Sequence, residues 1–226
     1  MPQIIKQGQR EIRTVTSRIE LRSVGEGDNQ QESIEGYALK FNKWSDTLGF
    51  FVPFREKIMP GALDDCDMSN VVALFNHSQD MPLGRNTIRS GSGSLNLNID
   101  GIGLNFNCIP TSTSYANDLK ENIRSNVVNQ CSFAFDIDYD DETAEEITWN
   151  EKDQIYERTI NKIKTLYDVS VVTTPAYPDT EAVVGQRCKE KIEELRNKKL
   201  EEAEQKRNKK IRNDELRKKL ILKTYL

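Results

Sequence analysis

The chain has 226 residues, of which 36% are hydrophobic and 30% charged, and its formal net charge is −4. This length suits one domain, or one domain with an appendage. No stretch approaches the roughly 18 apolar residues of a membrane span, and the N-terminal residues contain no apolar signal core. We therefore expect neither a membrane segment nor a secretory leader.

The body of the chain is predicted to consist mostly of short strands. Residues 1–14 are polar and are expected to form a flexible N-terminus. Polar–apolar alternation or short apolar runs predict strands at 18–22, 34–41, 50–54, 56–58, 71–75, 94–100, 104–109, 130–137, 157–163 and 165–173. One amphipathic helix is predicted over 114–126, because Leu119, Ile123 and Val127 are spaced to share one face.

These elements predict a mainly β fold of the α+β class. Pro82 and Gly84 mark residues 79–84 as a loop, and the acidic residues 140–146 are a second predicted loop. With at least seven strands and few helices, the body, taken as residues 15–185, is expected to form a closed or sandwiched sheet.

The C-terminal segment, residues 186–226, has a different composition. From Arg187 onward it has 15 Lys/Arg and 8 Asp/Glu, a net charge of +7, which leaves −11 for the rest of the chain. It contains neither Pro nor Gly and keeps no heptad, so we expect a long charged helix or a partly disordered tail, not a coiled coil. Because the body is acidic, it is not expected to bind nucleic acid.

The cysteines are widely spread. They are Cys66, Cys108, Cys131 and Cys188, and none belongs to a Cys-x-x-Cys pair or to a Cys/His cluster. This spacing disfavours structural zinc and indicates a reducing compartment. We expect no metal and no cofactor.

The only histidine, His77, follows a predicted core strand at 71–75. Any reaction that requires a group titrating near neutral pH has this one imidazole available. Taken alone, a histidine at this place is more often an ordinary surface residue.

Ser132 is a candidate nucleophile. Within the predicted strand 130–137, Cys131 and Phe133 share an apolar face, and Ser132 and Ala134 share a small, polar one. This alternation predicts that the Ser132 oxygen lies on the solvent side of a core strand. Cys131 is a competing nucleophile whose predicted face points into the core.

Asp168 interrupts an otherwise apolar strand at 165–173. A carboxylate buried there needs a compensating partner, and an imidazole is a suitable one. The alternative is an aspartate at an edge or strand end that faces water.

Taken together, these segments resemble the tailed-bacteriophage prohead proteases over roughly residues 15–185. The motifs occur in the order of that family, and they surround the only histidine; they are Pro60-Gly61-Ala62, Asn76-His77 with Pro82-Leu83-Gly84-Arg85 and Gly103-Leu104, Cys131-Ser132-Phe133-Ala134-Phe135, and residues 168–178. Two departures stand out: Ala134 replaces a usual glycine, and Asp168 is shorter by one methylene than the commoner glutamate.

The resemblance implies a fold similar to the herpesvirus assembly protease, a closed β-barrel of about seven strands flanked by helices. It also implies a serine endopeptidase that cleaves scaffold and major capsid protein segments inside the immature capsid, in the host bacterial cytoplasm. Apart from the resemblance, the charged tail is expected to be available to a partner, either a scaffold segment or a second copy of the chain. The family's serine, histidine and acid correspond to Ser132, His77 and Asp168.

Two other functions are weaker alternatives. A scaffold or assembly protein on the same fold, without catalysis, would have no need for a lone histidine beside a serine-bearing strand. A serine esterase is disfavoured because no Gly-x-Ser-x-Gly elbow surrounds any serine.

Overall fold

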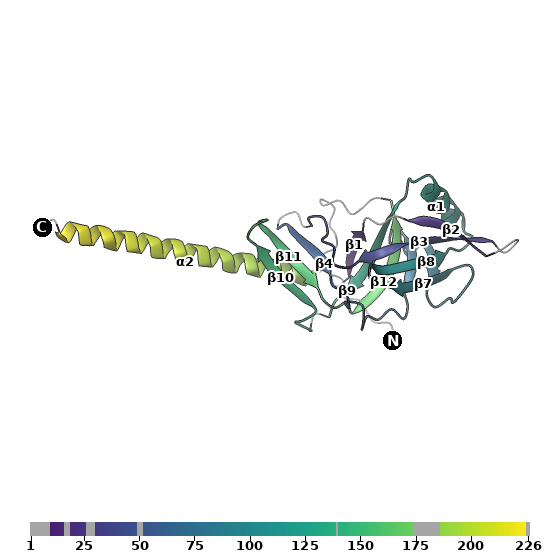
Figure 1. Ribbon diagram of the computed structural model, residues 1–226, viewed down its shortest axis with the longest axis horizontal. Helices are drawn as coiled ribbons and strands as arrows, with labels where there is room; N and C mark the ends of the chain where they lie inside the picture. Colours follow the sequence, from purple (N-terminus) through teal and green to yellow (C-terminus); the bar gives the residue numbers. More distant parts are fainter. Residues whose placement is uncertain are drawn as a thin grey trace. The chain divides into compact units, whose positions relative to one another are not determined.

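The computed structural model describes residues 10–15, 19–25, 30–48, 52–138, 140–173 and 186–224. Residues 1–186 and residues 187–226 form two compact units. Twelve strands and two helices are found in the described residues (Figure 1). They are β1 (Glu11–Val15), β2 (Glu20–Val24), β3 (Gln31–Lys40), β4 (Phe54–Ile58), β5 (Val72–Phe75), β6 (Pro82–Arg85), β7 (Ser94–Ile99), β8 (Gly103–Ile109), α1 (Ser114–Arg124), β9 (Gln130–Asp136), β10 (Glu145–Asn150), β11 (Ile155–Ile160), β12 (Thr165–Val172) and α2 (Gln186–Thr224).

The strands of the first unit form two sheets. The larger sheet has nine strands in the order β1-β9-β12-β5-β6-β7-β8-β3-β2, and the smaller has the order β10-β11-β4. The larger sheet curls, because β3 near one end contacts β9 and β1 at the other. Its described edges, β1 and β2, are not paired with each other. The prediction of a mainly β fold with at least seven strands is confirmed, but a closed barrel of about seven strands is not.

The apolar core explains why most of these strands could be predicted. Alternating side chains of β3, β8 and β9 are fully buried, among them Leu39, Phe106 and Phe133. Helix α1 contributes Leu119 and Ile123 through its inner face, as its spacing predicted.

Four local predictions were wrong. Residues 11–14 were expected to be flexible but belong to β1, and residues 79–84 were expected to be a loop although β6 begins at Pro82. Glu145 and Glu146 begin strand β10 instead of ending an acidic loop. Val127 is exposed because α1 already ends at Arg124.

The second unit contains helix α2, 39 residues long, whose described side chains beyond Ile192 are nearly all exposed. From Arg187 onward the segment is rich in charged residues, with 15 Lys/Arg and 8 Asp/Glu. No helix among the described residues is long and apolar enough to cross a membrane.

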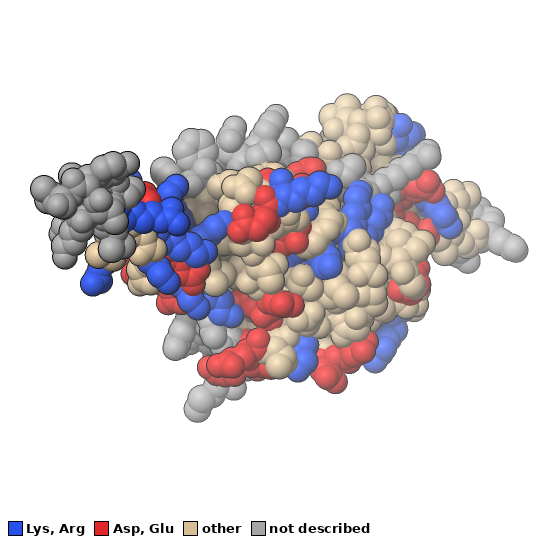
Figure 2. Space-filling model, turned by 60° about the vertical axis from the view of Figure 1, so that its left-hand side comes forward, with Lys and Arg blue, Asp and Glu red and all other residues tan. Residues whose placement is uncertain are grey.

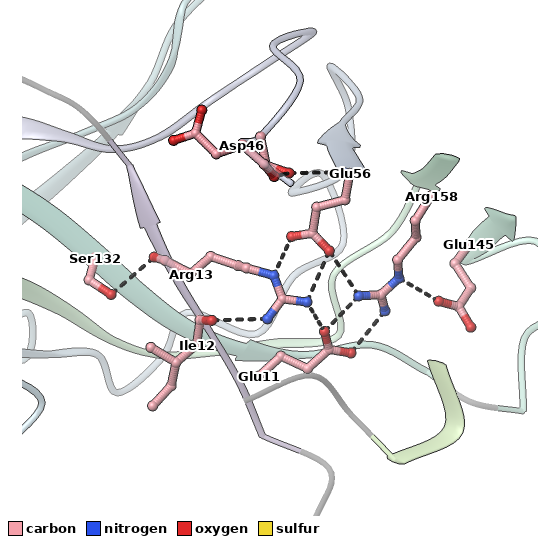
Figure 3. A network of polar contacts seen from close by, with 9 residues as sticks. Glu11, Ile12, Arg13, Asp46, Glu56, Ser132, Glu145 and Arg158 are labelled. Carbon is pink, nitrogen blue, oxygen red and sulfur yellow. Dashed lines mark hydrogen bonds and ion pairs between the residues drawn. The ribbon is translucent and has the colours of Figure 1, made fainter. Parts of the chain in front are cut away.

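A buried network of ionic side chains joins β1 to the smaller sheet (Figure 3). Arg158 of β11, with no exposed surface, donates hydrogen bonds to Glu11 at 2.6 and 2.8 Å and to Glu145 at 2.7 Å. Arg13 of β1 donates to Glu11 at 2.5 Å and forms a bidentate pair with Glu56 of β4. Buried charges are tolerated only when they are paired this closely, so β1, β4, β10 and β11 fix one another's positions.

Ion pairs on the surface of the molecule contribute less to stability than the buried network. Acidic and basic side chains lie next to one another on the face drawn in Figure 2. Examples from the body are Arg124 with Glu32 at 2.7 Å and Lys162 with Asp141 at 2.7 Å. Exposed pairs of this kind each contribute at most about 1 kcal/mol, so the buried network is the electrostatic feature that matters for stability.

Protonation of Glu11 is expected to destabilise the fold in acid. Burial opposes its charge, but Arg158 and Arg13 outweigh that effect and lower the pKa of Glu11 from 4.5 to about 2. Because the pKa is depressed in the folded state, the stabilisation is complete above pH 4.5 and is lost as the pH falls towards 2. The shift corresponds to about 3 kcal/mol.

Urea unfolding at a series of pH values measures this contribution. The Glu11→Gln variant should be less stable at pH 7 and should lose less additional stability between pH 4.5 and 2 than the unsubstituted chain. Glu146→Gln, which changes an exposed carboxylate of β10, is the matched control and should keep the original pH dependence. If the free energy of unfolding falls equally between pH 4.5 and 2 in the Glu11→Gln variant and in the unsubstituted chain, the acid destabilisation does not come from Glu11.

Candidate active site

The three predicted site residues come from three adjacent strands. The order β9-β12-β5 places Ser132 of β9 beside Asp168 and Ser170 of β12, and His77 follows the end of β5 by two residues. The registers bring Ser170 opposite Ser132, and Asp168 opposite both Ala134 and Val72. Side chains far apart in the sequence therefore meet on one patch of the large sheet.

The side chains form a continuous chain of hydrogen bonds. Nδ1 of His77 lies 2.6 Å from Oδ1 of Asp168, and Nε2 lies 2.5 Å from Oγ of Ser132. A carboxylate only accepts hydrogen bonds, so this arrangement suits the imidazole tautomer that has its proton on Nδ1 and leaves Nε2 to accept one from the serine. The shorter aspartate therefore reaches the imidazole, and Asp168 has the buried partner that its place in the strand requires.

A tight turn directs His77 towards these partners. Asn76 and His77 are both left-handed, with φ of 52° and 55°, and the Ser78 amide donates to the Phe75 carbonyl at 3.0 Å. Two successive residues in this conformation are costly without glycine, although Asn and His tolerate it better than most. The turn is tied to β12, since the Asn76 amide donates to Val171 O at 2.9 Å and the Asn76 side chain accepts from the Thr173 amide at 3.0 Å.

Two further residues, neither of them predicted from the sequence, hold the carboxylate. The Ser170 hydroxyl donates to Oδ1 of Asp168 at 2.8 Å and lies 3.2 Å from Nδ1 of His77. Arg10 forms an ion pair with Oδ2 of Asp168. Ser170 could have been found from its i+2 spacing, which places it on the same face of the strand as Asp168; Arg10 had no such signal.

The expectation that Ser132 faces solvent was wrong. Ser132 has no exposed surface, and all residues of β9 from Cys131 to Phe135 are buried. Strand β1 pairs with the free edge of β9, and its Arg13 carbonyl oxygen accepts a hydrogen bond from the Ser132 hydroxyl at 3.0 Å. Alternation within one strand predicts the two faces correctly, but it does not reveal what packs on each.

Cys131 lies in the core, as predicted from its face. Burial raises the pKa of its thiol to about 12. Since the thiolate is the nucleophilic form, this cysteine is a poor nucleophile near neutral pH. Of the two candidate nucleophiles, Ser132 is therefore favoured over Cys131.

Comparison with known proteins identifies a family and a similar fold. The family described as caudovirus prohead serine protease matches residues 17–197. A solved structure of the bacteriophage T4 capsid assembly protease gp21 superimposes with a TM-score of 0.50 at 12% sequence identity, covering 75% of this chain and 100% of that one. A search of curated proteins gave no match.

The family match extends over most of the chain, so the chain belongs to the caudovirus prohead serine proteases. It is accordingly a serine protease of phage capsid assembly. The low identity to gp21 limits that comparison to the fold.

The turn at Asn76 provides a test of how His77 is held. Asn76→Ala removes the acceptor for the Thr173 amide and forces alanine into a left-handed conformation, so the variant should lose about 1–2 kcal/mol of unfolding free energy. Asn76→Gly loses the same acceptor without the conformational cost and should lose less. Urea unfolding of both variants measures the difference, and equal stability of Asn76→Ala and the unsubstituted chain would refute this role of the turn.

Proposed function

We propose that the chain is the endopeptidase of prohead maturation, and that Ser132 is its nucleophile, His77 its general base and Asp168 the acid that orients His77. The observation that carries the proposal is the hydrogen-bonded series Asp168–His77–Ser132, with consecutive distances of 2.6 and 2.5 Å. This arrangement is the one that serine hydrolases on unrelated folds use.

The chemistry follows from the proton positions. Nε2 of His77 takes the hydroxyl proton as Oγ of Ser132 attacks the carbonyl carbon of a peptide bond. The imidazolium then gives this proton to the leaving amine, and a water molecule, deprotonated in the same way, hydrolyses the resulting ester. Asp168 stabilises the imidazolium through Nδ1 and keeps the tautomer that both steps require.

The surroundings of Asp168 support its role. Its side chain is 1% exposed and accepts from Ser170 at 2.8 Å as well as from His77. Such additional partners hold a carboxylate in one orientation, which is what a residue that positions an imidazole requires. A non-catalytic assembly protein on the same fold would gain nothing from this arrangement.

The substrates that we propose are extended segments of the scaffold and the major capsid protein. They would be cleaved inside the immature capsid, in the cytoplasm of the bacterial host. The family membership and the name of the T4 relative, a capsid assembly protease, support this assignment.

Substitution of the three residues tests the mechanism. Ser132→Ala and His77→Ala should abolish processing when the chain is co-expressed with its capsid protein, while the thermal unfolding midpoint changes little. Asp168→Asn should cost about a thousandfold or more in kcat, but less than either of the others. Intact-mass spectrometry of the capsid protein gives the readout.

Cys131→Ala is the matched control for the nucleophile, because it removes the neighbouring side chain and leaves Ser132 in place. It should retain cleavage. If Cys131→Ala is inactive while Ser132→Ala still cleaves, the nucleophile is Cys131.

We further propose that residues 15–185 are the protease domain and that the tail at 186–226 serves to recruit it. Two properties support this: the tail from Arg187 carries a net charge of +7, and most described side chains of α2 are exposed. A tether to a scaffold segment, or to a second copy of the protease, would raise the effective concentration of the enzyme near its substrate without changing the active site.

Deletion of residues 187–226 should leave cleavage of a short peptide within about twofold and reduce incorporation into proheads at least tenfold, which quantitative blotting of purified particles measures. Replacing Lys206, Arg207, Lys209 and Lys210 by Gln keeps the helix length and tests whether charge alone is responsible. Packaging of the truncated enzyme at the original level would contradict recruitment.

A further inference from the structure

The proposed nucleophile is inaccessible in this structure. Ser132 has no exposed surface, Asp168 is 1% exposed and the His77 side chain is 15% exposed. Attack requires the carbonyl carbon of a substrate to come within about 3–3.5 Å of the serine oxygen. A segment of the protein must therefore leave before a peptide can react.

Among the described residues, strand β1 is the segment that lies alongside Ser132. It runs antiparallel to β9, and the register puts Thr14 opposite Ser132 and Arg13 opposite Phe133. The Ser132 hydroxyl donates to the carbonyl oxygen of Arg13 at 3.0 Å (Figure 3). A backbone carbonyl of the protein itself thus lies beside the nucleophile, where a substrate carbonyl would have to lie.

This contact also competes with the first step of the reaction. The Ser132 hydroxyl has one proton, and both Nε2 of His77 and the carbonyl oxygen of Arg13 lie within hydrogen-bond distance of Oγ. A proton donated to Arg13 is not available to His77. Strand β1 therefore both excludes substrate and offers the hydroxyl an unproductive acceptor.

Side chains of the same segment hold β1 in place. Arg10 pairs with Asp168 of the site and lies over the Tyr167 ring, 5.5 Å from its centre. Arg13 forms its bidentate pair with Glu56, and the Arg13 side chain is only 5% exposed. The segment is thus bound by both its backbone and its charges.

Strand β1 is also the terminal strand of the described sheet, so its departure breaks no pairing except that with β9. The edge of β9 would then present unpaired backbone groups beside Ser132, which is the usual docking surface for an extended peptide. Glu56 would lose its bidentate cationic partner at the same time.

From these contacts we propose that the outer edge of β9 is the substrate-binding site of the protease, and that residues 10–15 occupy it as an internal competitor. The ligand is an extended polypeptide that pairs antiparallel with β9 and places a basic side chain opposite Glu56, as Arg13 does. This inference rests on the proposed function, since it takes Ser132 as the reacting group.

A reversible disulfide between β1 and β9 tests whether β1 must leave β9 before a substrate can be cleaved. Position 15 lies opposite Cys131 in the register, so Val15→Cys creates a pair that one disulfide can join between β1 and β9. In the oxidised full chain, cleavage of a fluorogenic peptide should fall at least tenfold relative to the reduced chain, and a reductant should restore it. The double variant Val15→Cys/Cys131→Ser cannot form this bond and should respond to neither treatment.

Full activity of the oxidised variant, with the disulfide verified by mass spectrometry, would show that β1 need not move and would overturn the proposal. Absence of cleavage from the reduced variant and from the unsubstituted chain alike would count against the proposed function. The binding site is decided separately by a measurement that does not depend on catalysis.

That measurement uses the full chain with Ser132→Ala and a fluorescent peptide with the sequence of residues 8–17. Fluorescence anisotropy should show binding that becomes at least tenfold tighter when Arg10→Ala and Arg13→Ala weaken the internal strand. Circular dichroism establishes that this variant is folded; if it is not, Arg10→Ala alone is compared, with a smaller gain expected. No binding by the weakened folded variant, or equal affinity with and without the substitutions, would refute the site.

A second peptide tests the role of Glu56. Replacing the arginine that corresponds to Arg13 by glutamate should weaken binding at least tenfold, because it places two carboxylates together. Equal affinity of the two peptides would remove Glu56 from substrate recognition.

Discussion

The first unit depends on the pairing of charges at the junction of its two sheets. Arg158 has no contact with water, and its guanidinium is satisfied by Glu11, Glu56 and Glu145 from three different strands. Removal of one member would leave an unpaired charge in the interior, which typically costs about 3–5 kcal/mol. The position of β1 is therefore dictated by the smaller sheet as well as by β9.

The geometry of the site follows from strand order. Parallel pairing of β12 with β5, and antiparallel pairing of β12 with β9, bring the ends of distant segments together on one surface. The strained turn at Asn76 and His77 then orients the His77 side chain towards Ser132 of β9 and Asp168 of β12. Strain at such a place is tolerated because Val171 of β12 binds the Asn76 amide and Thr173, directly after β12, binds the Asn76 side chain.

The sequence alone predicted the core strands and helix α1 from alternation and a helical repeat. It also singled out three residues that the structure brings together, from a lone histidine, a serine on a small polar face and a carboxylate in an apolar strand. Strand β1 has no such signal. Its charged residues Glu11 and Arg13 would ordinarily indicate a solvated segment, and they are buried only because Glu56 and Arg158 lie opposite them in the fold. Partners more than 40 residues away cannot be read from the local pattern, so the strand that lies beside Ser132 was not predicted.

The use of charges to hold β1 has a consequence for how easily it can be exchanged. An apolar strand would gain stability from every buried methylene and would expose an aggregation-prone edge when it left. A charged strand regains hydration when it leaves, but Glu56 and Arg158 stay behind in the interior and lose partners. Arg10, Glu11 and Arg13 therefore specify the position of β1 closely, and a substrate strand can take its place only if it offers Glu56 and Arg158 new charged partners. The same argument explains why Arg10 pairs with Asp168: the ion pair that helps to hold the strand is broken when the strand leaves, and Asp168 is then left with His77 and Ser170 as its partners.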